Sequence, residues 1–180
     1  MKLLLKTALV IIFICSFQAK YSHGLDLSNN NPESNEGKIL IHLPVRINIS
    51  GLDDFESDWK VGDGAIRHDD KLCIYTNSDI GYRIIAESQN GNGKFRLNNN
   101  SLKRKIAYVV KWRDSISRRF TNLTEGAQST IFNTDAQRSI NCDNELNSTL
   151  RIRINKSQLQ KVSGSDEAYF DTLTLTVSPA

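Results

Sequence analysis

The last strand-like segment of this chain constrains its fold more than any other feature. Between Tyr169 and Val177 the sequence alternates apolar side chains with threonines, and it ends three residues later at Ala180. Successive side chains of a β-strand point to opposite faces of the sheet, so this alternation predicts a strand with one buried face. A domain that closes on such a strand keeps this last segment inside a sheet, as β-sandwiches do.

One-sided apolar patterning recurs along the chain. Alternate positions are apolar in three further segments, Ile39–Ile49, Ile106–Trp112 and Leu150–Ile154. Pro44 interrupts the first of them and has no amide hydrogen, which favours an edge strand or a break at that point. Turn-forming residues separate these runs, and no segment has a long helical period. The chain is therefore predicted to be all-β, an antiparallel sandwich of about seven or eight strands.

Shorter signals complete the expected order of elements. Two short apolar runs, 72–75 and 82–86, flank Asn77–Gly81 and predict a β-hairpin. The sequence further predicts a loop over 51–70, a strand over 94–97, a short strand within 121–131 and a loop over 133–143. Residues 157–162 fit either one helical turn or a crossing loop.

The N-terminal residues have the pattern of a secretion signal. Lys2 and Lys6 provide a positive start, an apolar run follows, and small residues come at Ser22 and Gly24. We expect residues 1–24 to be a signal peptide, with cleavage after Gly24 or, as the second choice, after Ala19. Residues 25–37 are polar and turn-rich and predict a flexible leader, so 38–180 is the expected β-sandwich domain.

Removal of residues 1–24 would leave two of the three cysteines, Cys73 and Cys142. An even pair in an exported chain most simply forms one disulfide. Neither cysteine has the Cys-x-x-Cys spacing of a redox site or the further ligands that zinc requires. Cys15 follows the bulky Ile14, where a lipoprotein signal needs a small residue, so lipidation is disfavoured.

Charge argues against a nucleic-acid partner. The full chain has 23 basic and 20 acidic residues, and Lys2, Lys6 and Lys20 all lie in the expected signal peptide. The remaining chain is formally neutral, whereas nucleic-acid binding favours a basic face. Basic spots occur at 103–105, at 118–119 and at Arg151 with Arg153. Arg151 and Arg153 lie opposite the apolar parity of their strand, so solvent exposure explains them, and a polyanion site is the less favoured alternative. No segment after the signal approaches the length of a membrane span.

The residues do not point to catalysis, a cofactor or a metal. Only His42 and His68 remain outside the signal peptide, too few and too far apart for a zinc site. The acidic loop Asp53–Asp58 lacks the ligand order of an EF-hand and reads better as a solvated loop than as a calcium site. Trp112 shares the apolar parity of its strand and predicts core packing. Trp59 lies in a polar loop, so it is the candidate for a surface contact with a ligand, although it would equally cap the sandwich.

The order of these features resembles a bacterial export family, the spore coat protein U-like domains and the subunits of archaic chaperone–usher pili. The matching segments, spread over about 130 residues, are 49–54, 72–75, 106–112, 123–126, Cys142, 150–154 and 169–177. The aromatic-x-Asp-Thr sequence at Tyr169–Thr172 is the best single match. The resemblance implies an immunoglobulin-like β-sandwich in the periplasm or at the cell surface, in which a subunit donates a strand into a neighbour's groove. It implies a periplasmic chaperone, an usher or fellow pilus subunits as partners.

This sequence departs from that pattern at its N-terminus. A polymerising subunit carries a donor strand ahead of its own first strand, yet Leu25–Gly37 is polar and Ile39–Ile49 is expected to belong to the domain. Either that long run serves both roles around Pro44, or this protein does not polymerise as a shaft subunit does, and a tip adhesin or a stand-alone relative is then equally favoured. The leading hypothesis is an exported fimbrial-type structural or adhesive subunit, not an enzyme. The alternatives are a stand-alone periplasmic or secreted module that binds a sugar or a protein and, least favoured, a secreted hydrolase.

Overall fold

The structure is a computed structural model that describes residues 2–7, 44–133, 142, 146–164 and 167–180. The chain divides into two compact units, and the first, Met1–Phe13 with Val45–Ala180, holds all the described strands. The second, Ile14–Pro44, lies outside the described residues apart from Pro44. The expected flexible leader at 25–37 and most of the expected signal peptide therefore fall outside the description.

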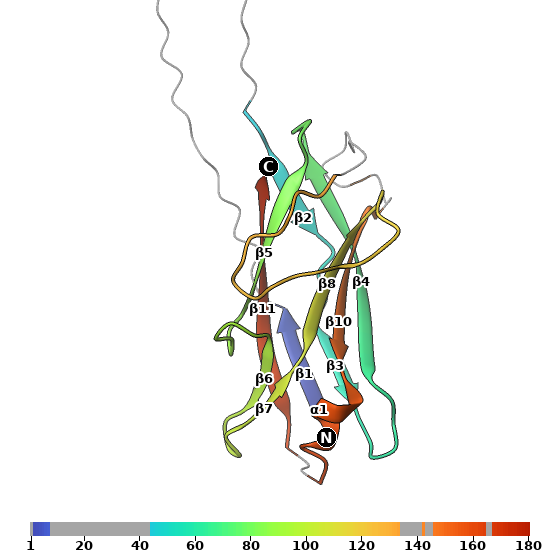
Figure 1. Ribbon diagram of the computed structural model, residues 1–180, viewed down its shortest axis with the longest axis vertical. Coiled ribbons are helices and arrows are strands. Elements are labelled where there is room, and N and C mark those ends of the chain that lie inside the picture. The colour runs from blue at the N-terminus through green and yellow to red at the C-terminus, as the bar shows by residue number, and fades with distance from the viewer. Residues whose placement is uncertain (1, 8–43, 134–141, 143–145, 165–166) are drawn as a thin grey trace, which may run out of the picture. The chain divides into compact units, whose positions relative to one another are not determined.

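The described residues form eleven strands and one short helix (Figure 1). In chain order these are β1 (Lys2–Thr7), β2 (Ile47–Ser50), β3 (Phe55–Asp58), β4 (Ile66–Thr76), β5 (Tyr82–Ser88), β6 (Arg96–Asn99), β7 (Arg104–Ala107), β8 (Val109–Asp114), β9 (Thr121–Asn122), β10 (Ser148–Ile154), α1 (Lys156–Gln160) and β11 (Tyr169–Pro179). The short strand expected within 121–131 is β9. At 157–162 the sequence fits a helical turn or a crossing loop, and the structure has a helical turn, α1, whose Leu159 is fully buried.

The strands make two sheets. One has the order β3-β1-β11-β6-β7, with β5 also pairing β11, and the other has the order β2-β4-β10-β8-β9. All strand pairs are antiparallel except β1 with β11. The predicted fold class, an all-β antiparallel sandwich with one disulfide, is confirmed.

The core lies between the inner faces of the two sheets, as the alternation in the sequence requires. On β11 the inward residues Tyr169, Leu173 and Leu175 are at most 2% exposed. Trp112 of β8 is fully buried, which confirms its predicted place in the core. Twenty further apolar side chains join the same cluster, from both sheets and from the segments between strands, among them Leu72, Ile84, Leu97 and Ile152.

The predicted hairpin at 72–86 is wrong. β4 pairs with β2 and β10 in one sheet, whereas β5 pairs with β11 in the other, so residues 77–81 carry the chain between sheets. Gly81 makes this crossing with a φ of +100°, and a Cβ there would lie 2.2 Å from the carbonyl oxygen of Phe132. Turn residues between two apolar runs indicate a reversal but do not distinguish a hairpin from a crossing.

The predicted loop at 51–70 is also wrong in two places, because it contains β3 and the first part of β4. Each stretch has one apolar residue, Phe55 in β3 and Ile66 in the first part of β4, so no apolar alternation marks them. For residues 106–112 the predicted buried face is confirmed, but the prediction of one continuous run is wrong. It divides into β7 and β8, which lie in different sheets on either side of Tyr108, and Ile106, Tyr108 and Val110 all remain inside.

Candidate functional site

The lower half of β11 and the whole of β3 enclose a position in the sheet that β1 occupies (Figure 1). β1 runs parallel to β11 and pairs Leu3 to Thr7 with Tyr169 to Leu173. On its other side β1 runs antiparallel to β3 and pairs Lys2 to Leu5 with Asp58 to Phe55. We call this position, bounded by Tyr169–Leu173 and Phe55–Asp58, the strand slot.

β1 is the element that joins β3 to the rest of its sheet. Among the strand pairs of the described residues, β3 takes part in one, with β1. The order β3-β1-β11 therefore places β3 beyond β1, without a ladder of its own to β11. Any loss of β1 would leave two unpaired backbone edges facing one another, one on β3 and one on β11.

Side-chain contacts attach β3 to the opposite sheet. The ring of Phe55 stacks on the imidazole of His68, with 4.2 Å between centroids and 19° between planes. His68 Nε2 in turn lies 2.5 Å from Asp70 Oδ1. The wall of the strand slot on this side thus contacts β4 through an aromatic stack, and a polar pair within β4 involves the stacked imidazole.

Asp70 is an unusual residue in this anchor because it is only 6% exposed. Burial raises the pKa of this carboxyl above its ordinary value, and the neighbouring His68 opposes that shift. Its second oxygen, Oδ2, is buried and has no hydrogen-bond partner among the described residues. A buried polar atom without a partner costs free energy, so this pair is not a strong support for β3.

On the other wall, β11 carries a saturated buried carboxylate. Asp171 is 1% exposed and accepts hydrogen bonds at Oδ2 from Ser88 Oγ and from the Tyr108 hydroxyl, both at 2.6 Å. Its Oδ1 accepts bonds from the backbone and side-chain nitrogens of Asn90, both at 3.0 Å. Burial, followed by the charge of Asp171, raises the pKa of Tyr108 well above its ordinary value, so the hydroxyl stays protonated and donates.

This network gives the aromatic-x-Asp-Thr sequence of the last strand a physical role. Asp171 ties β11 to β5, to the turn after β5 and to the residue that separates β7 from β8. Sequence reasoning singled out the motif through a resemblance but not its function. A lone acid on the apolar parity of a strand was the available signal, because a buried carboxylate needs several donors.

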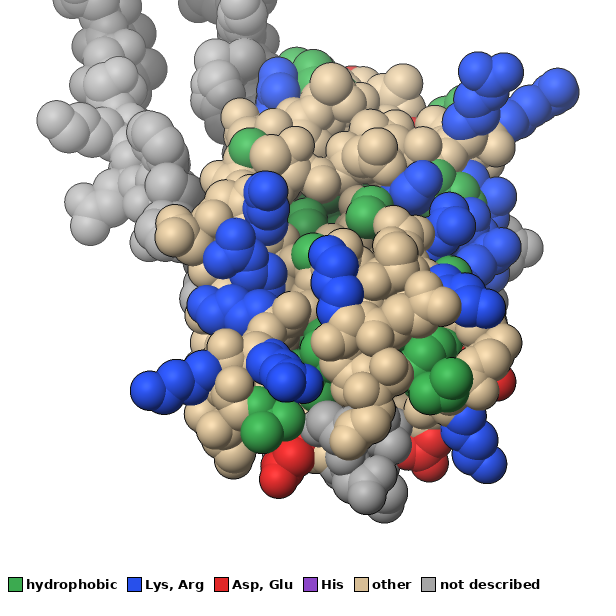
Figure 2. All heavy atoms as spheres, turned by 60° about the horizontal axis from the view of Figure 1, so that its bottom comes forward, with side chains coloured by type: hydrophobic (Ala, Val, Ile, Leu, Met, Phe, Trp, Pro, Cys, Tyr) green, Lys and Arg blue, Asp and Glu red, His purple; other side chains and the backbone are tan. Residues whose placement is uncertain are grey.

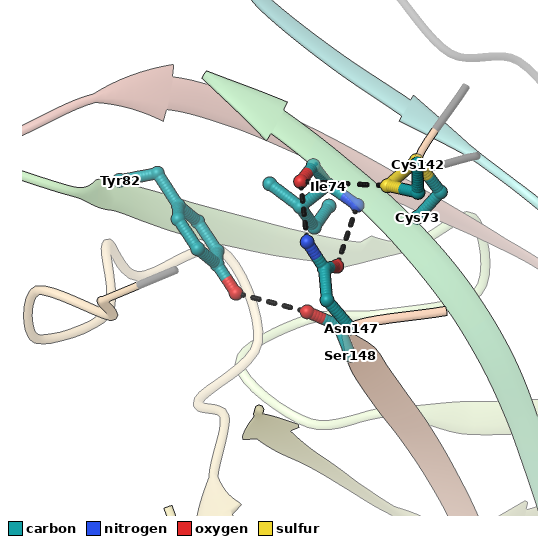
Figure 3. The surroundings of a disulfide bond; sticks show 6 residues. All are labelled: Cys73, Ile74, Tyr82, Cys142, Asn147 and Ser148. Atoms are coloured by element: carbon teal, nitrogen blue, oxygen red, sulfur yellow. Dashed lines mark hydrogen bonds between the residues drawn. A yellow bond between two sulfur atoms is a disulfide. The ribbon is translucent and has the colours of Figure 1, made fainter. Parts of the chain in front are cut away.

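The predicted disulfide is present. Cys73 of β4 and Cys142 are joined, with a Cα–Cα distance of 5.8 Å (Figure 3). Beside it, Asn147 donates from Nδ2 to the Ile74 carbonyl at 2.7 Å and accepts from the Ile74 amide at 2.9 Å. The side chain of Asn147 thereby repeats the bonding pattern of a paired strand next to the bridge.

Trp59, the candidate for a surface ligand contact, is 4% exposed and belongs to the core cluster. Its indole N–H donates to the Gly64 carbonyl at 2.9 Å. An indole that is buried and bonded in this way offers almost no surface to a ligand, so Trp59 corresponds to the alternative of a cap on the sandwich. The polar sequence around Trp59 does not reveal that the ring caps the sandwich, because its indole bonds to a backbone atom, the Gly64 carbonyl oxygen.

In the part of the chain that the structure describes, no group of three or more His, Cys, Asp or Glu side chains is arranged to hold a metal ion. No helix within the same residues is long and apolar enough to cross a membrane.

No protein-family model matches this chain, and no curated protein matches it either. Solved structures that are similar to it include the following two. One, titled a chaperone–tip adhesin complex vital for synergistic activation of CFA/I fimbriae biogenesis, matches with a TM-score of 0.50 and 15% identity over 76% of this chain. The other, CfaE, the adhesive subunit of the CFA/I fimbria of enterotoxigenic Escherichia coli, matches with a TM-score of 0.42 and 14% identity over 68%.

The chain covers 41% and 43% of those two structures, less than half the length of each. At this identity the first likeness concerns the fold alone. The β-sandwich described above is thus similar in fold to a structure of a fimbrial tip adhesin complex.

Proposed function

We propose that this chain is an exported fimbrial-type structural or adhesive subunit that acts through strand-mediated assembly with other protein chains. The observation that carries the proposal is the strand slot. Its two walls belong to the body of the domain, whereas the strand within it comes from residues 2–7. A sheet whose inner strand is supplied from a remote segment can accept the same backbone bonds from another chain.

The secretion signal explains why the slot would become vacant. β1 lies wholly within the residues that we expect a signal peptidase to remove, 1–24. Cleavage would take away five residue pairs with β11 and four with β3. The exported chain would then contain an open groove above its core, which a strand from a chaperone or a neighbouring subunit would close.

A candidate donor segment lies ahead of β2. The apolar alternation that begins at Ile39 continues to Ile49, but the described strand β2 starts only at Ile47. Val45, on the same parity, is 55% exposed. We propose that Lys38–Leu43 donates its alternating side chains to the strand slot of a second copy, and that Pro44 separates this donor from β2.

The finer assignment is to the spore coat protein U-like and archaic chaperone–usher group, with an assembly chaperone, an usher or fellow subunits as partners. Its supports are the sequence segments quoted above and the likeness in fold to the tip adhesin complex. On this assignment the chain works in the periplasm or at the cell surface, as part of a fimbrium, and performs no catalysis.

One observation favours a second candidate, a stand-alone binding module. In the full-length chain the strand slot is filled by the chain itself, so a protein that keeps residues 2–7 is closed and needs no donor. Retention of this segment would make the domain a monomeric exported module.

The deciding experiment compares two purified chains, residues 25–180 and residues 44–180. Both lack β1, and only the first contains the candidate donor. We expect 25–180 to form linear polymers on size-exclusion chromatography and electron microscopy. We expect residues 44–180 to form no polymers and to bind a synthetic Lys38–Leu43 peptide.

The control peptide has the same sequence with Ile41 replaced by Pro, which removes a backbone donor and breaks strand pairing. It should not bind. A chain 25–180 that is a stable monomer with a sharp two-state unfolding transition, unchanged by either peptide, would contradict the proposal.

A further inference from the structure

The outer face of the second sheet gathers basic side chains on three adjacent strands. Inward and outward residues alternate on β4, β10 and β8, and the outward positions of their central portions carry six cations. These are Arg67 and Lys71 of β4, Arg151 and Arg153 of β10, and Lys111 and Arg113 of β8. Figure 2, which brings the bottom of Figure 1 forward, shows that Lys and Arg side chains outnumber Asp and Glu on that side of the molecule as a whole. We call these six residues the basic face.

The strand register places like charges directly opposite one another. Arg153 is the partner of Arg67 across β10 and β4, and Arg151 is the partner of Lys111 across β10 and β8. Opposed like charges destabilise a sheet, and Asp69, which faces Arg151 across β10 and β4, offsets only part of this repulsion.

One carboxylate lies among the six cations and is already engaged. Asp69 receives both Nε and Nη2 of Arg151 at 2.7 Å and also Nη2 of Arg67 at 2.7 Å. The hydrogen bonds from Arg151, ahead of those from Arg67, hold the pKa of Asp69 well below its ordinary value. None of the three ion pairs among the described residues of the chain involves Lys71, Lys111 or Arg153.

An aromatic ring fixes part of the basic face. The guanidinium carbon of Arg151 lies 3.7 Å from the ring centroid of Phe120, and that of Arg113 lies 4.7 Å from it. Cation–π contact holds both planar groups in place. Arg113 is in none of the three ion pairs of the described residues, so its oriented guanidinium can bind carboxylate or sulfate oxygens in pairs. Because these guanidinium groups are oriented before a ligand arrives, less side-chain entropy is lost when the ligand binds.

We propose that the basic face binds a linear acidic polysaccharide, one that carries carboxylate or sulfate groups along an extended chain. Rows of cations on neighbouring strands, about 4.8 Å apart, form a flat surface suited to an extended polyanion. None of the exposed large hydrophobic side chains of the described residues lies on β4, β8 or β10, which disfavours insertion into a lipid surface. The Phe120 ring is covered by guanidinium groups, so it offers no platform for stacking a base.

This inference does not depend on strand-mediated assembly. A monomer or a fimbrial subunit would present the same outer face, because the strand slot belongs to the other sheet. A chain that does not assemble through the strand slot can therefore still be tested for polysaccharide binding, and a chain that does not bind polysaccharide can still be tested for assembly.

The test uses the full-length chain with its disulfide formed, and polygalacturonate of defined length as the probe in titration calorimetry. The face variant is Lys71→Gln/Lys111→Gln/Arg153→Gln. The matched control is Lys103→Gln/Arg104→Gln/Lys105→Gln, which removes the same charge from the end of the turn before β7 and from the first two residues of β7. Thermal melting checks that both variants fold.

We expect the face variant to bind about tenfold more weakly, since three exposed ion pairs each contribute about twofold. The control should change the affinity less than twofold, and neutral dextran should not bind. Equal weakening by both variants would overturn the proposal in favour of general charge attraction. Absence of wild-type binding, or tighter binding to anionic phospholipid vesicles or single-stranded DNA than to polygalacturonate, would also overturn it.

Discussion

The two edges of β11 are built from different kinds of partner. On one edge β5 pairs with Leu173–Pro179 over seven residues, and both strands belong to the body of the domain. On the other edge β1 pairs with Tyr169–Leu173 over five residues and comes from the N-terminus. The first edge is permanent, and the second is complete only while a separate segment fills the strand slot. One strand can thus serve the core and an assembly interface at once, because its side chains and its backbone edges are used independently.

The largest effect should come from removal of the disulfide, which joins residues outside both edges of β11. Replacing Cys73 and Cys142 together by Ala should lower the free energy of unfolding by about 4 kcal/mol, since the bridge closes a loop of 69 residues. Urea unfolding of the full-length chain measures this. Added Lys38–Leu43 peptide should not restore the loss, and a restoration would show that the disulfide acts through the strand slot.

The permanent edge is tested by Leu175→Ala. Leu175 pairs with Ala86 of β5 and is 2% exposed, so the cavity should cost about 3 kcal/mol. Thr174→Ala, on the outer parity of the same strand, is the matched control and should cost under about 1 kcal/mol. If a strand peptide rescued Leu175→Ala, the distinction between the two edges would fail.

The replaceable edge is tested by Phe55→Ala. Removal of the ring ends the stack on His68 and loosens β3, with a cost of about 1 kcal/mol in the full-length chain. In residues 44–180 the same change should weaken capture of the Lys38–Leu43 peptide, as measured by calorimetry. Unchanged peptide affinity would mean that β3 is not a wall of the slot.

The smallest effect is expected at Asp70. Its folded pKa is raised by burial, so the carboxyl favours folding below that pKa, and this contribution is lost as pH rises through it from the ordinary value near 3.8. Asp70→Asn removes this titration and should change stability at neutral pH by less than about 1 kcal/mol. Unfolding curves collected across pH should be flatter for the variant above pH 4, and a steeper dependence would contradict this account of Asp70.

The apolar alternation predicted most of the core and much of the strand order, because period-two patterning reports which side of a strand is buried. It identified β10, β11 and the inward face shared by β7 and β8. It failed at β3 and at the start of β4, where His68 and Asp70 face inward as polar groups, and at Gly81, where a crossing has the same turn residues as a hairpin.

The strand slot itself was not predictable from patterning. Residues 2–7 have the composition of a secretion signal, and nothing in that composition indicates pairing with residues 169–173. The basic face was visible only in part, since Arg151 and Arg153 alternate in sequence but their opposition to Lys111 and Arg67 depends on strand register.

Hydrogen–deuterium exchange of the backbone amides tests the central claim most directly. The comparison is between the full-length chain and residues 44–180, with and without the Lys38–Leu43 peptide. Removal of β1 should speed exchange in Phe55–Asp58 and Tyr169–Leu173, leave Tyr82–Ser88 of β5 protected, and be reversed by the peptide. Equal protection of Tyr169–Leu173 in both chains would contradict the existence of a replaceable edge.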